Sequence, residues 1–448
     1  MKRTLIYSAV VAALGGLLFG FDTAVISGTT GWLELVFQLT PAQLGFTVAS
    51  ALIGTIIGAL FVGKPTDRYG RRFMLFILAL LYFISALGSS LAWDWYSFLL
   101  FRLIGGLGVG GASVVSPMYI AEISPAQYRG RMVAVAQLNI VFGMLLAYFS
   151  NYLIVTLDIG PAEWRWMFGV EAIPAALFFI FLFTTPRSPR WLVARGLEGE
   201  ARQVIEMCGS DSGSVSNEIA IIKCSLHLEN QQQTEPFFTR KYRFPIYLAV
   251  MLALFNQLSG INAVLYYAPV IFDMAGFEKS SALLNTIGVG SVFLIFTLAA
   301  MAVIDRIGRK KLMIYGSIGY ILSLSATAWA FFSFDTDISN LGKWVVLGGL
   351  FLFIASHAFG QGSVIWVYLS EIFPNRVRAR GQALGTTTHW IAAAFISWTF
   401  PLIADFSGGY AFTFYAICMV GQLLWVIFSM KETKGISLEE IQHEMGIQ

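Results

Sequence analysis

Residues 255–269 read FNQLSGINAVLYYAP and lie inside an apolar segment that covers residues 244–274. A helix rises about 1.5 Å per residue, so Asn256 lies roughly 18 Å from the start of a segment that is long enough to cross a bilayer. Unpaired amides are costly in hydrocarbon, so the carboxamides and phenols of this stretch must face a polar space. Neutral donors and acceptors suit an uncharged polyhydroxy ligand, and Gly260 and Pro269 favour a break in the helix beside it.

Composition predicts an integral membrane protein. The chain has 448 residues, of which 57% are hydrophobic and 12% are charged, and its mean hydropathy is +0.70. A soluble enzyme of this composition would expose large apolar patches, so that class is excluded. The first apolar run lacks a small-residue cleavage site and further spans follow it, so we do not interpret it as a signal peptide. The three cysteines show no paired framework, and neither disulfides nor a metal site is expected.

Hydrophobic windows of about 20 residues predict twelve membrane spans. Lysine and arginine gather on one side of these spans, and the other side carries only Arg165, Lys279 and Lys343. The positive-inside rule therefore places both termini and the middle loop in the cytoplasm. The approximate limits of the spans are 6–30, 43–63, 73–92, 97–121, 131–156, 166–185, 244–274, 282–304, 311–333, 343–371, 379–403 and 408–430.

The middle loop, residues 186–243, divides the chain into six spans before it and six after it. We therefore expect an N-terminal bundle (1–185), a C-terminal bundle (244–430) and a cytoplasmic tail (431–448) that forms a short helix. Apolar residues at helical spacing within the loop predict short amphipathic helices, in a linker without an activity of its own.

The two halves of the chain repeat one another. The pattern Y-x-x-E-x-x-P-x-x-x-R occurs at residues 119–129 and again at 368–378, an offset of 249 residues, and the charges of residues 67–72 recur at 305–310. Parallel repeats with a shared site between them are typical of transporters that work by alternating access. The expected fold is an all-α membrane protein whose twelve transmembrane helices form two pseudo-symmetric six-helix bundles.

In their order and length these motifs resemble the sugar porter family of the major facilitator superfamily, and most of all its bacterial sugar–proton symporters of the xylose and glucose type. The likeness extends from the first span to Glu432-Thr433-Lys434-Gly435 in the tail. It implies the major facilitator fold and the proton-coupled uptake of a monosaccharide, a hexose or a pentose.

Asp22 and Arg102 lie in the first and fourth predicted spans, where charged side chains are rare and usually functional. The resemblance implies that Asp22 takes the coupling proton and that Arg102 tunes it, because facilitative members carry a neutral residue at the position of Asp22. A purely structural ion pair is the alternative.

The resemblance also implies a set of substrate-binding residues, in which aromatic faces and neutral amides match the faces and hydroxyl edges of a sugar. Asn256 departs from the family because it is one methylene shorter than the usual glutamine. His389 stands where relatives have glutamine or asparagine, and it could bind sugar, titrate or simply pack. Both departures concern which sugar is preferred. The implied set is Phe19, Gln137, Asn256, Gln257, Asn262, Tyr266, Trp366, His389 and Trp390.

The repeated cytoplasmic charges form a second constellation, for which the resemblance implies a latch that closes the cytoplasmic side between the two bundles. Helix capping and anchoring to lipid headgroups are the alternatives. Arg187 replaces the acid of the family's P-E-S-P-R motif, so one ion pair of the relatives is expected to be missing or rewired. The latch residues are Glu122, Arg129, Glu371, Arg378, Asp67, Arg71, Asp305 and Arg309.

The expected partners are a monosaccharide, a proton and the lipid bilayer, with no cofactor, metal or nucleic acid. The chain is expected to work as a monomer in the plasma (inner) membrane. Facilitative uniport of a sugar or polyol is one alternative function. A sugar sensor that barely transports is another, although the chain ends soon after Lys434, which disfavours a signalling tail. An enzyme is disfavoured because no nucleophile–base pair is visible.

Overall fold

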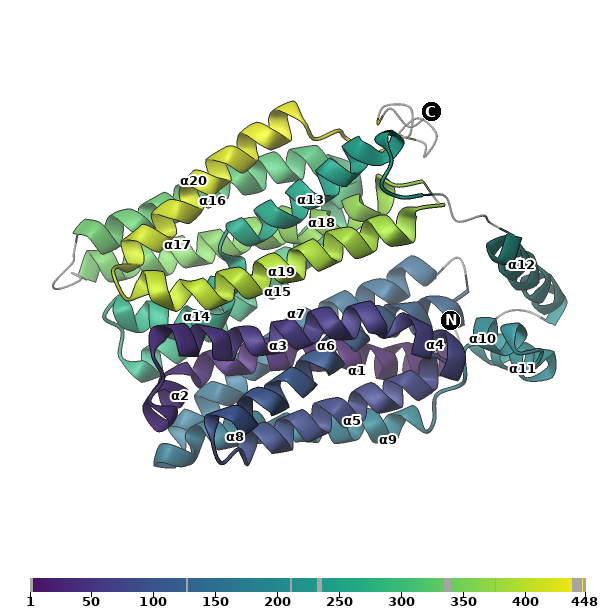
Figure 1. The fold of residues 1–448 in the computed structure, drawn as a ribbon, viewed down its shortest axis with the longest axis horizontal. Helices are drawn as coiled ribbons and strands as arrows, with labels where there is room; N and C mark the ends of the chain where they lie inside the picture. Colours follow the sequence, from purple (N-terminus) through teal and green to yellow (C-terminus); the bar gives the residue numbers. More distant parts are fainter. Residues whose placement is uncertain are drawn as a thin grey trace. The chain divides into compact units, whose positions relative to one another are not determined.

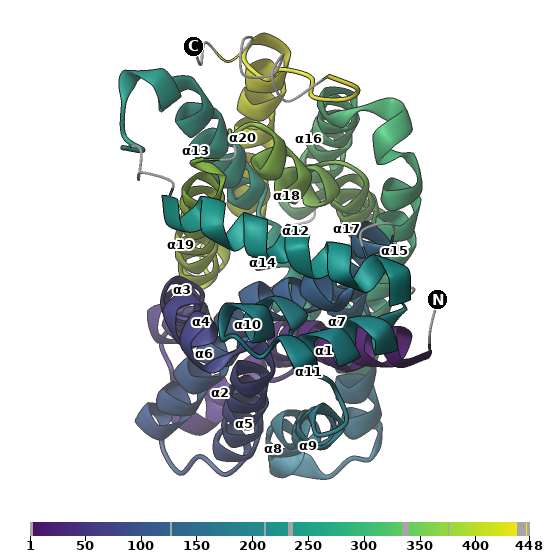
Figure 2. The same ribbon diagram turned by 90° about the vertical axis from the view of Figure 1, so that its right-hand side faces the viewer.

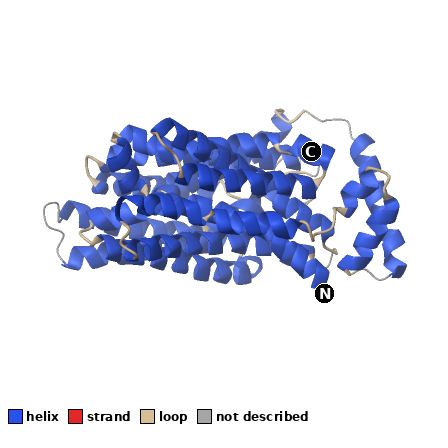
Figure 3. Ribbon diagram, turned by 90° about the horizontal axis from the view of Figure 1, so that it is seen from below, coloured by secondary structure: helices blue, strands red, loops and turns tan. Residues whose placement is uncertain are grey.

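The computed structural model describes residues 3–125, 128–209, 212–231, 236–333, 340–374 and 376–436, together with Met445. All regular structure in these ranges is helical (Figure 3). The chain forms two compact units, which are described separately. Unit 1 comprises Met1–Val25, Ile53–Ala147 and Ala162–Gln233, and unit 2 comprises Ile26–Leu52, Tyr148–Pro161 and Thr234–Gln448.

The helices that lie in unit 1 are α1 (Arg3–Val25), α4 (Gly63–Tyr69), α5 (Arg71–Ser90), α6 (Trp95–Ile123), α8 (Glu163–Val170), α9 (Ala172–Leu182), α10 (Pro189–Ala194), α11 (Glu198–Cys208) and α12 (Ser212–Gln231). Unit 2 holds α2 (Thr30–Phe37), α13 (Arg243–Leu258), α14 (Ile261–Met274), α15 (Lys279–Ile307), α16 (Arg309–Ser333), α17 (Asn340–Phe359), α18 (Gln361–Glu371), α19 (Arg378–Ala404) and α20 (Gly408–Phe428). Two of the boundaries between the units fall inside helices, namely α3 (Pro41–Phe61) and α7 (Arg129–Thr156).

Eleven segments of the described chain are long and apolar enough to cross a membrane, and they coincide with eleven of the predicted spans. The remaining predicted span, 379–403, corresponds to α19, which has 27 residues. At about 1.5 Å per residue α19 is also long enough to cross a bilayer. It is less apolar because Thr386, Thr387, Thr388 and His389 follow one another near its centre.

In unit 1, α6 packs against both α1 and α5, and α9 packs against α1 and α5. Glycine brings α1 and α7 into backbone contact. A Cβ added at Gly20 would collide with the carbonyl of Ile140, and one added at Gly143 would collide with the carbonyl of Leu17. These two glycines therefore fix a close approach of the two helices.

The linker forms the predicted short helices α10, α11 and α12 at one end of the unit 1 helices (Figures 1 and 2). Leu192 and Ile205 share one buried cluster with Leu5 of α1, so the apolar faces of α10 and α11 pack on the bundle. The tail differs from expectation where it is described, because Lys431–Ile436 contains no helix. The rest of the predicted tail helix lies outside the described residues.

Unit 2 contains two interrupted segments. The expected break in the seventh span is present at Gly260, whose φ of +84° is a left-handed conformation that glycine adopts readily. A second break separates α17 from α18 at Gly360. Elsewhere α16 packs against α17 and α20, and α13 packs against α19.

Segments from the first half of the chain are part of unit 2. The Tyr148 hydroxyl donates to the carbonyl of Leu265 over 2.9 Å, and the indole of Trp398 donates to the carbonyl of Ala42 over 3.1 Å. The ammonium of Lys279 also lies 4.7 Å from the centre of the Trp32 ring.

Candidate functional site

The predicted proton-coupling residues form a buried ion pair in unit 1. Nη1 of Arg102 lies 2.5 Å from Oδ1 of Asp22, and Nη2 donates to the backbone carbonyl of Asp22 over 3.3 Å. Both side chains are 2% exposed. The guanidinium also lies 5.4 Å from the centre of the Phe168 ring. Two opposite charges can persist at this depth because each supplies the counter-charge of the other.

Sequence reasoning missed a second acid beside this pair. Glu171, between α8 and α9, is 1% exposed and interacts electrostatically with both Asp22 and Arg102. Its Oε1 accepts no hydrogen bond within the described chain. The signal that would have found Glu171 is the one that singled out Asp22, namely an acid inside a predicted span.

Two of the predicted substrate-binding residues lie in unit 1, in different environments. Phe19 lies on α1, partly buried, and packs against the main apolar cluster of the unit. Gln137 lies on α7 with its side chain exposed. Both stay predictions as sugar-binding residues.

Five of the predicted substrate-binding residues meet in unit 2 around the carboxamide of Gln257. Its Nε2 donates to Oδ1 of Asn256 over 3.0 Å and lies 3.2 Å from Nε2 of His389. The ring of His389 lies 5.1 Å from that of Trp366 at 58° and 5.0 Å from that of Trp390 at 90°. The α13 amides and two indoles are therefore joined through one imidazole, which α19 supplies.

Two amide atoms of this cluster, and one of Asn262 on α14, have no hydrogen-bond partner among the described residues. They are Nδ2 of Asn256, Oε1 of Gln257 and Nδ2 of Asn262, all buried. Buried polar atoms are nearly always hydrogen-bonded in native proteins, so two donors and one acceptor here are available to a ligand or to water. Asn262 and the buried Tyr266 both lie on α14, just after the break at Gly260.

The predicted latch residues make matching contacts inside each unit. In unit 1, Arg71 lies 3.1 Å from Asp67 and 2.9 Å from Glu122, and Ser188 donates to Glu122 over 2.5 Å.

In unit 2, Arg309 lies 3.0 Å from Asp305 and 2.8 Å from Glu371, and Thr433 donates to Glu371 over 2.5 Å. We call each set, an Asp, an Arg, a Glu and a hydroxyl, a cytoplasmic circuit. The hydroxyls of Ser188 and Thr433 were not predicted to take part.

The other latch residues add little to these circuits. Nε of Arg378 donates to the carbonyl of Phe373 over 3.3 Å, and the side chain of Arg129 lies outside the described part. Arg187, the departure from the family motif, forms a pair of 3.6 Å with Glu200. Both side chains of this pair are about half exposed, so the pair contributes little to stability.

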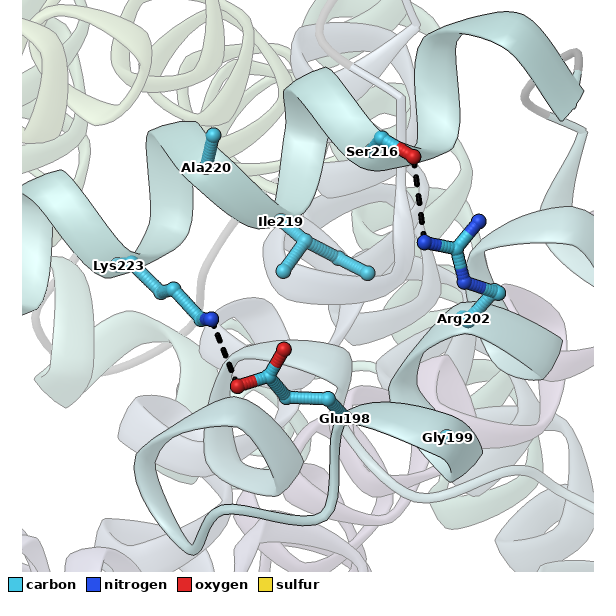
Figure 4. A pocket seen from close by; sticks show the side chains of 7 residues that line it. All are labelled: Glu198, Gly199, Arg202, Ser216, Ile219, Ala220 and Lys223. Atoms are coloured by element: carbon cyan, nitrogen blue, oxygen red, sulfur yellow. Dashed lines mark hydrogen bonds and ion pairs between the residues drawn. The ribbon is translucent and has the colours of Figure 1, made fainter.

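A hollow of about 320 Å³ lies on the linker, between α11 and α12 (Figure 4). The charged side chains that line it each have a polar partner. Lys223 forms an ion pair with Glu198 over 2.7 Å, and Arg202 donates to the hydroxyl of Ser216 over 3.2 Å. The charges that face the hollow are thus already engaged, and we assign it no role.

Helices that cross a membrane, a buried ion pair within them and a cluster of amides and indoles define a membrane transporter for a small polar solute. A model of the family of sugar (and other) transporters matches residues 8–445. The chain belongs to that family.

Relatives and solved structures agree with this assignment. The chain is 39% identical to the D-xylose-proton symporter of Escherichia coli, over 97% of this chain and 94% of the symporter. It is 36% identical to the glucose transport protein of Synechocystis, over 98% and 97% of the two chains.

Among solved structures, the partially occluded inward open conformation of the xylose transporter XylE from E. coli matches with a TM-score of 0.86. That match has 38% identity and covers 97% of this chain and all of that chain. The fold is therefore that of the major facilitator superfamily, and the protein is a transporter.

Proposed function

We propose that this protein takes up a monosaccharide by proton symport. The observation that carries the proposal is the Gln257 cluster, in which buried amide atoms that have no hydrogen-bond partner in the described part of the chain lie beside aromatic rings. Hydroxyl groups of a sugar match such donors and acceptors, and an indole covers its C–H face. Relatives named as D-xylose-proton and arabinose-proton symporters support the same substrate class.

The ion pair of Asp22 and Arg102 supports coupling to a proton. Protonation of Asp22 removes the counter-charge of Arg102, so binding of a proton and formation of the pair compete. A helix movement that separates the two side chains favours protonation, and their approach favours release. Conformation and proton occupancy are linked in this way, as alternating access requires.

Further parts of the proposal concern the arrangement in the membrane. The protein works as a monomer in the plasma (inner) membrane, with both termini and the linker in the cytoplasm, as the distribution of Lys and Arg indicates. Residues 1–185 and 244–430 act as the two moving bundles. Phe19 and Gln137 complete the sugar site, and the latch residues close its cytoplasmic side in the outward-open state.

The test is uptake into proteoliposomes, with a panel of pentoses and hexoses, with and without an inward proton gradient. Symport predicts accumulation above equilibrium that depends on the gradient for at least one sugar. Equilibration that ignores the gradient would identify a uniporter, and tight binding without flux would identify a sensor.

A further inference from the structure

The tenth membrane segment is interrupted at Gly360, where α17 ends and α18 begins. The backbone there has φ −98° and ψ −100°, far from helical values. A Cβ on Gly360 would come within about 3 Å of Gly316 and of the carbonyls of Ser356 and Leu312. The break is therefore packed tightly against α16.

One phenol contacts the residues on both sides of this break. The hydroxyl of Tyr320, on α16, lies 2.5 Å from Nδ1 of His357 in the last turn of α17. The same hydroxyl donates to Oε1 of Gln361, the first residue of α18, over 3.3 Å. Gly362 leaves room for the imidazole, because a Cβ there would lie 2.8 Å from Nε2 of His357.

The hydrogen bonds continue from Gln361 to two other helices. Nε2 of Gln361 donates to Oε1 of Gln422 on α20 over 2.8 Å, and Nε2 of Gln422 donates to the hydroxyl of Ser317 over 2.9 Å. Ser317 in turn donates to the carbonyl of Met313 over 2.7 Å. From Tyr320 onward every bond donates in the same direction, so each bond polarises the next.

Polar side chains at this depth are costly unless they are paired. Gln361, Gln422 and Ser317 are completely buried, as is Tyr320, and His357 is 5% exposed. Apolar residues would fill a membrane-embedded bundle without the risk of an unpaired group. A polar chain that is fully connected and joins both sides of a break instead specifies one geometry for that break.

The geometry of the break decides where α18 points, and α18 carries Trp366. This residue follows Gln361 by about one and a half helical turns. Its ring lies 5.1 Å from that of His389, which contacts the carboxamide of Gln257. A change in the direction of α18 would therefore move the indole relative to the amide cluster.

We propose that the hydrogen-bonded chain of His357, Tyr320, Gln361, Gln422 and Ser317 holds α18 in the direction that places Trp366 over the sugar. Gln361 and His357 are then positioning residues that act on substrate through Trp366 without touching it. This inference rests on the proposed function, in which Trp366 contacts sugar.

The test is a double-mutant cycle on sugar affinity. Equilibrium binding of radiolabelled D-xylose or D-glucose, whichever the liposome panel selects, is measured for the purified full chain and for Gln361→Leu, Trp366→Ala and the double variant. Gln361→Leu is expected to weaken binding about tenfold. The double variant is expected to bind within about twofold of Trp366→Ala alone, because Gln361 has no effect once the indole is gone.

Three further variants distinguish a positioning role from a general loss of folding. Ser323→Ala is the matched control. Ser323 is buried on α16, and among the described residues its hydroxyl donates to the carbonyl of Tyr320 over 3.1 Å, without taking part in the hydrogen bonds that join the two sides of the break. It is expected to leave affinity unchanged. His357→Gln keeps a hydrogen-bonding group and should retain affinity within about threefold, whereas His357→Leu should lose it.

The outcomes separate this inference from the proposed function. Should Gln361→Leu fail to fold, His357→Leu takes its place in the cycle, on the other side of the break. Losses that add in the double variant, or unchanged affinity in both folded leucine variants while Trp366→Ala weakens binding, overturn the inference and leave the sugar site standing. Unchanged affinity in Trp366→Ala overturns the site itself.

Discussion

Arg102 and Asp22 lie 2.5 Å apart with both side chains almost completely excluded from solvent. Glu171, which is also buried, interacts electrostatically with both members of this pair. Each member of the ion pair supplies the counter-charge of the other, so each depends on the other both for stability and for what happens when a proton binds.

Replacement of Asp22 by asparagine is expected to abolish proton-driven accumulation and to leave sugar exchange across the membrane intact. The asparagine keeps the shape of the side chain but cannot bind and release a proton. Counterflow in liposomes measures exchange, and uptake under a proton gradient measures accumulation. Accumulation that survives in Asp22→Asn would rule out this carboxyl as the coupling site.

Removal of Arg102 alone should destabilise the fold. Arg102→Leu leaves a buried carboxylate without a counter-charge, which typically costs about 3–5 kcal/mol. The double variant Asp22→Asn/Arg102→Leu removes both charges and should recover most of the loss. Thermal unfolding in detergent gives the comparison, and a double variant no more stable than Arg102→Leu would show that the loss comes from packing.

Replacement of His389 by glutamine should change sugar preference and preserve transport. A carboxamide at this position can still contact Gln257, but the aromatic contact with Trp366 is lost. The ratio of affinities for pentoses and hexoses is expected to move by about threefold or more. Competition between sugars in counterflow measures the ratio. Equal weakening for all sugars would instead identify His389 as a packing residue.

The hydroxyls of Ser188 and Thr433, one in each cytoplasmic circuit, are expected to contribute similarly to the free energy of unfolding. Ser188→Ala and Thr433→Ala each remove a donor to a paired glutamate, and each should lower the free energy of unfolding by about 1–3 kcal/mol. Thr156→Ala is the control, because among the described residues the hydroxyl of Thr156 donates to the carbonyl of Leu153 in its own helix. A large loss for one hydroxyl and none for the other would contradict the equivalence of the circuits.

Acid should weaken the cap of α6. The backbone amide of Ser97 donates to the carboxylate of Asp94 over 2.7 Å, and this bond lowers the pKa of Asp94 from its ordinary value of 3.8. Because the pKa is depressed in the folded state, the stabilisation is present above the ordinary value and is lost as pH falls through the lowered one.

Asp94→Asn also caps a helix but does not titrate there. The melting temperature of wild type should therefore fall more than that of Asp94→Asn between about pH 5 and pH 3. Parallel melting curves for the two proteins would refute the role of this cap in the acid response.

The sequence could predict the membrane spans because their signal is local. The fourth span was expected at 97–121 and forms α6 at Trp95–Ile123. The break at Gly260 was expected from glycine among midplane amides, and it is present. The break at Gly360 was not expected, because the stretch Gly360-Gln361-Gly362 lies within a long apolar segment that predicts one continuous span.

The contacts within the predicted sites could not be predicted from the sequence and are seen only in the structure. Residue types identified Asp22, Gln257 and His389, but spacing does not show that Gln257 and His389 touch from helices more than a hundred residues apart. The circuits illustrate the same limit. Glu371 was visible in the repeat, whereas its bond to Thr433 depends on how the chain after α20 returns to the bundle.

The inclusion of residues 26–52 and 148–161 in unit 2 has a consequence for biosynthesis. The ribosome delivers the buried phenol of Tyr148 to the membrane before it has made Leu265, and the carbonyl of Ala42 long before Trp398. Until those partners are synthesised, water or the insertion machinery must provide hydrogen bonds to these groups. The early spans therefore reach their final packing only after the eleventh span has been translated. A nascent chain that stalls before this point exposes polar groups without their partners, which quality control can recognise.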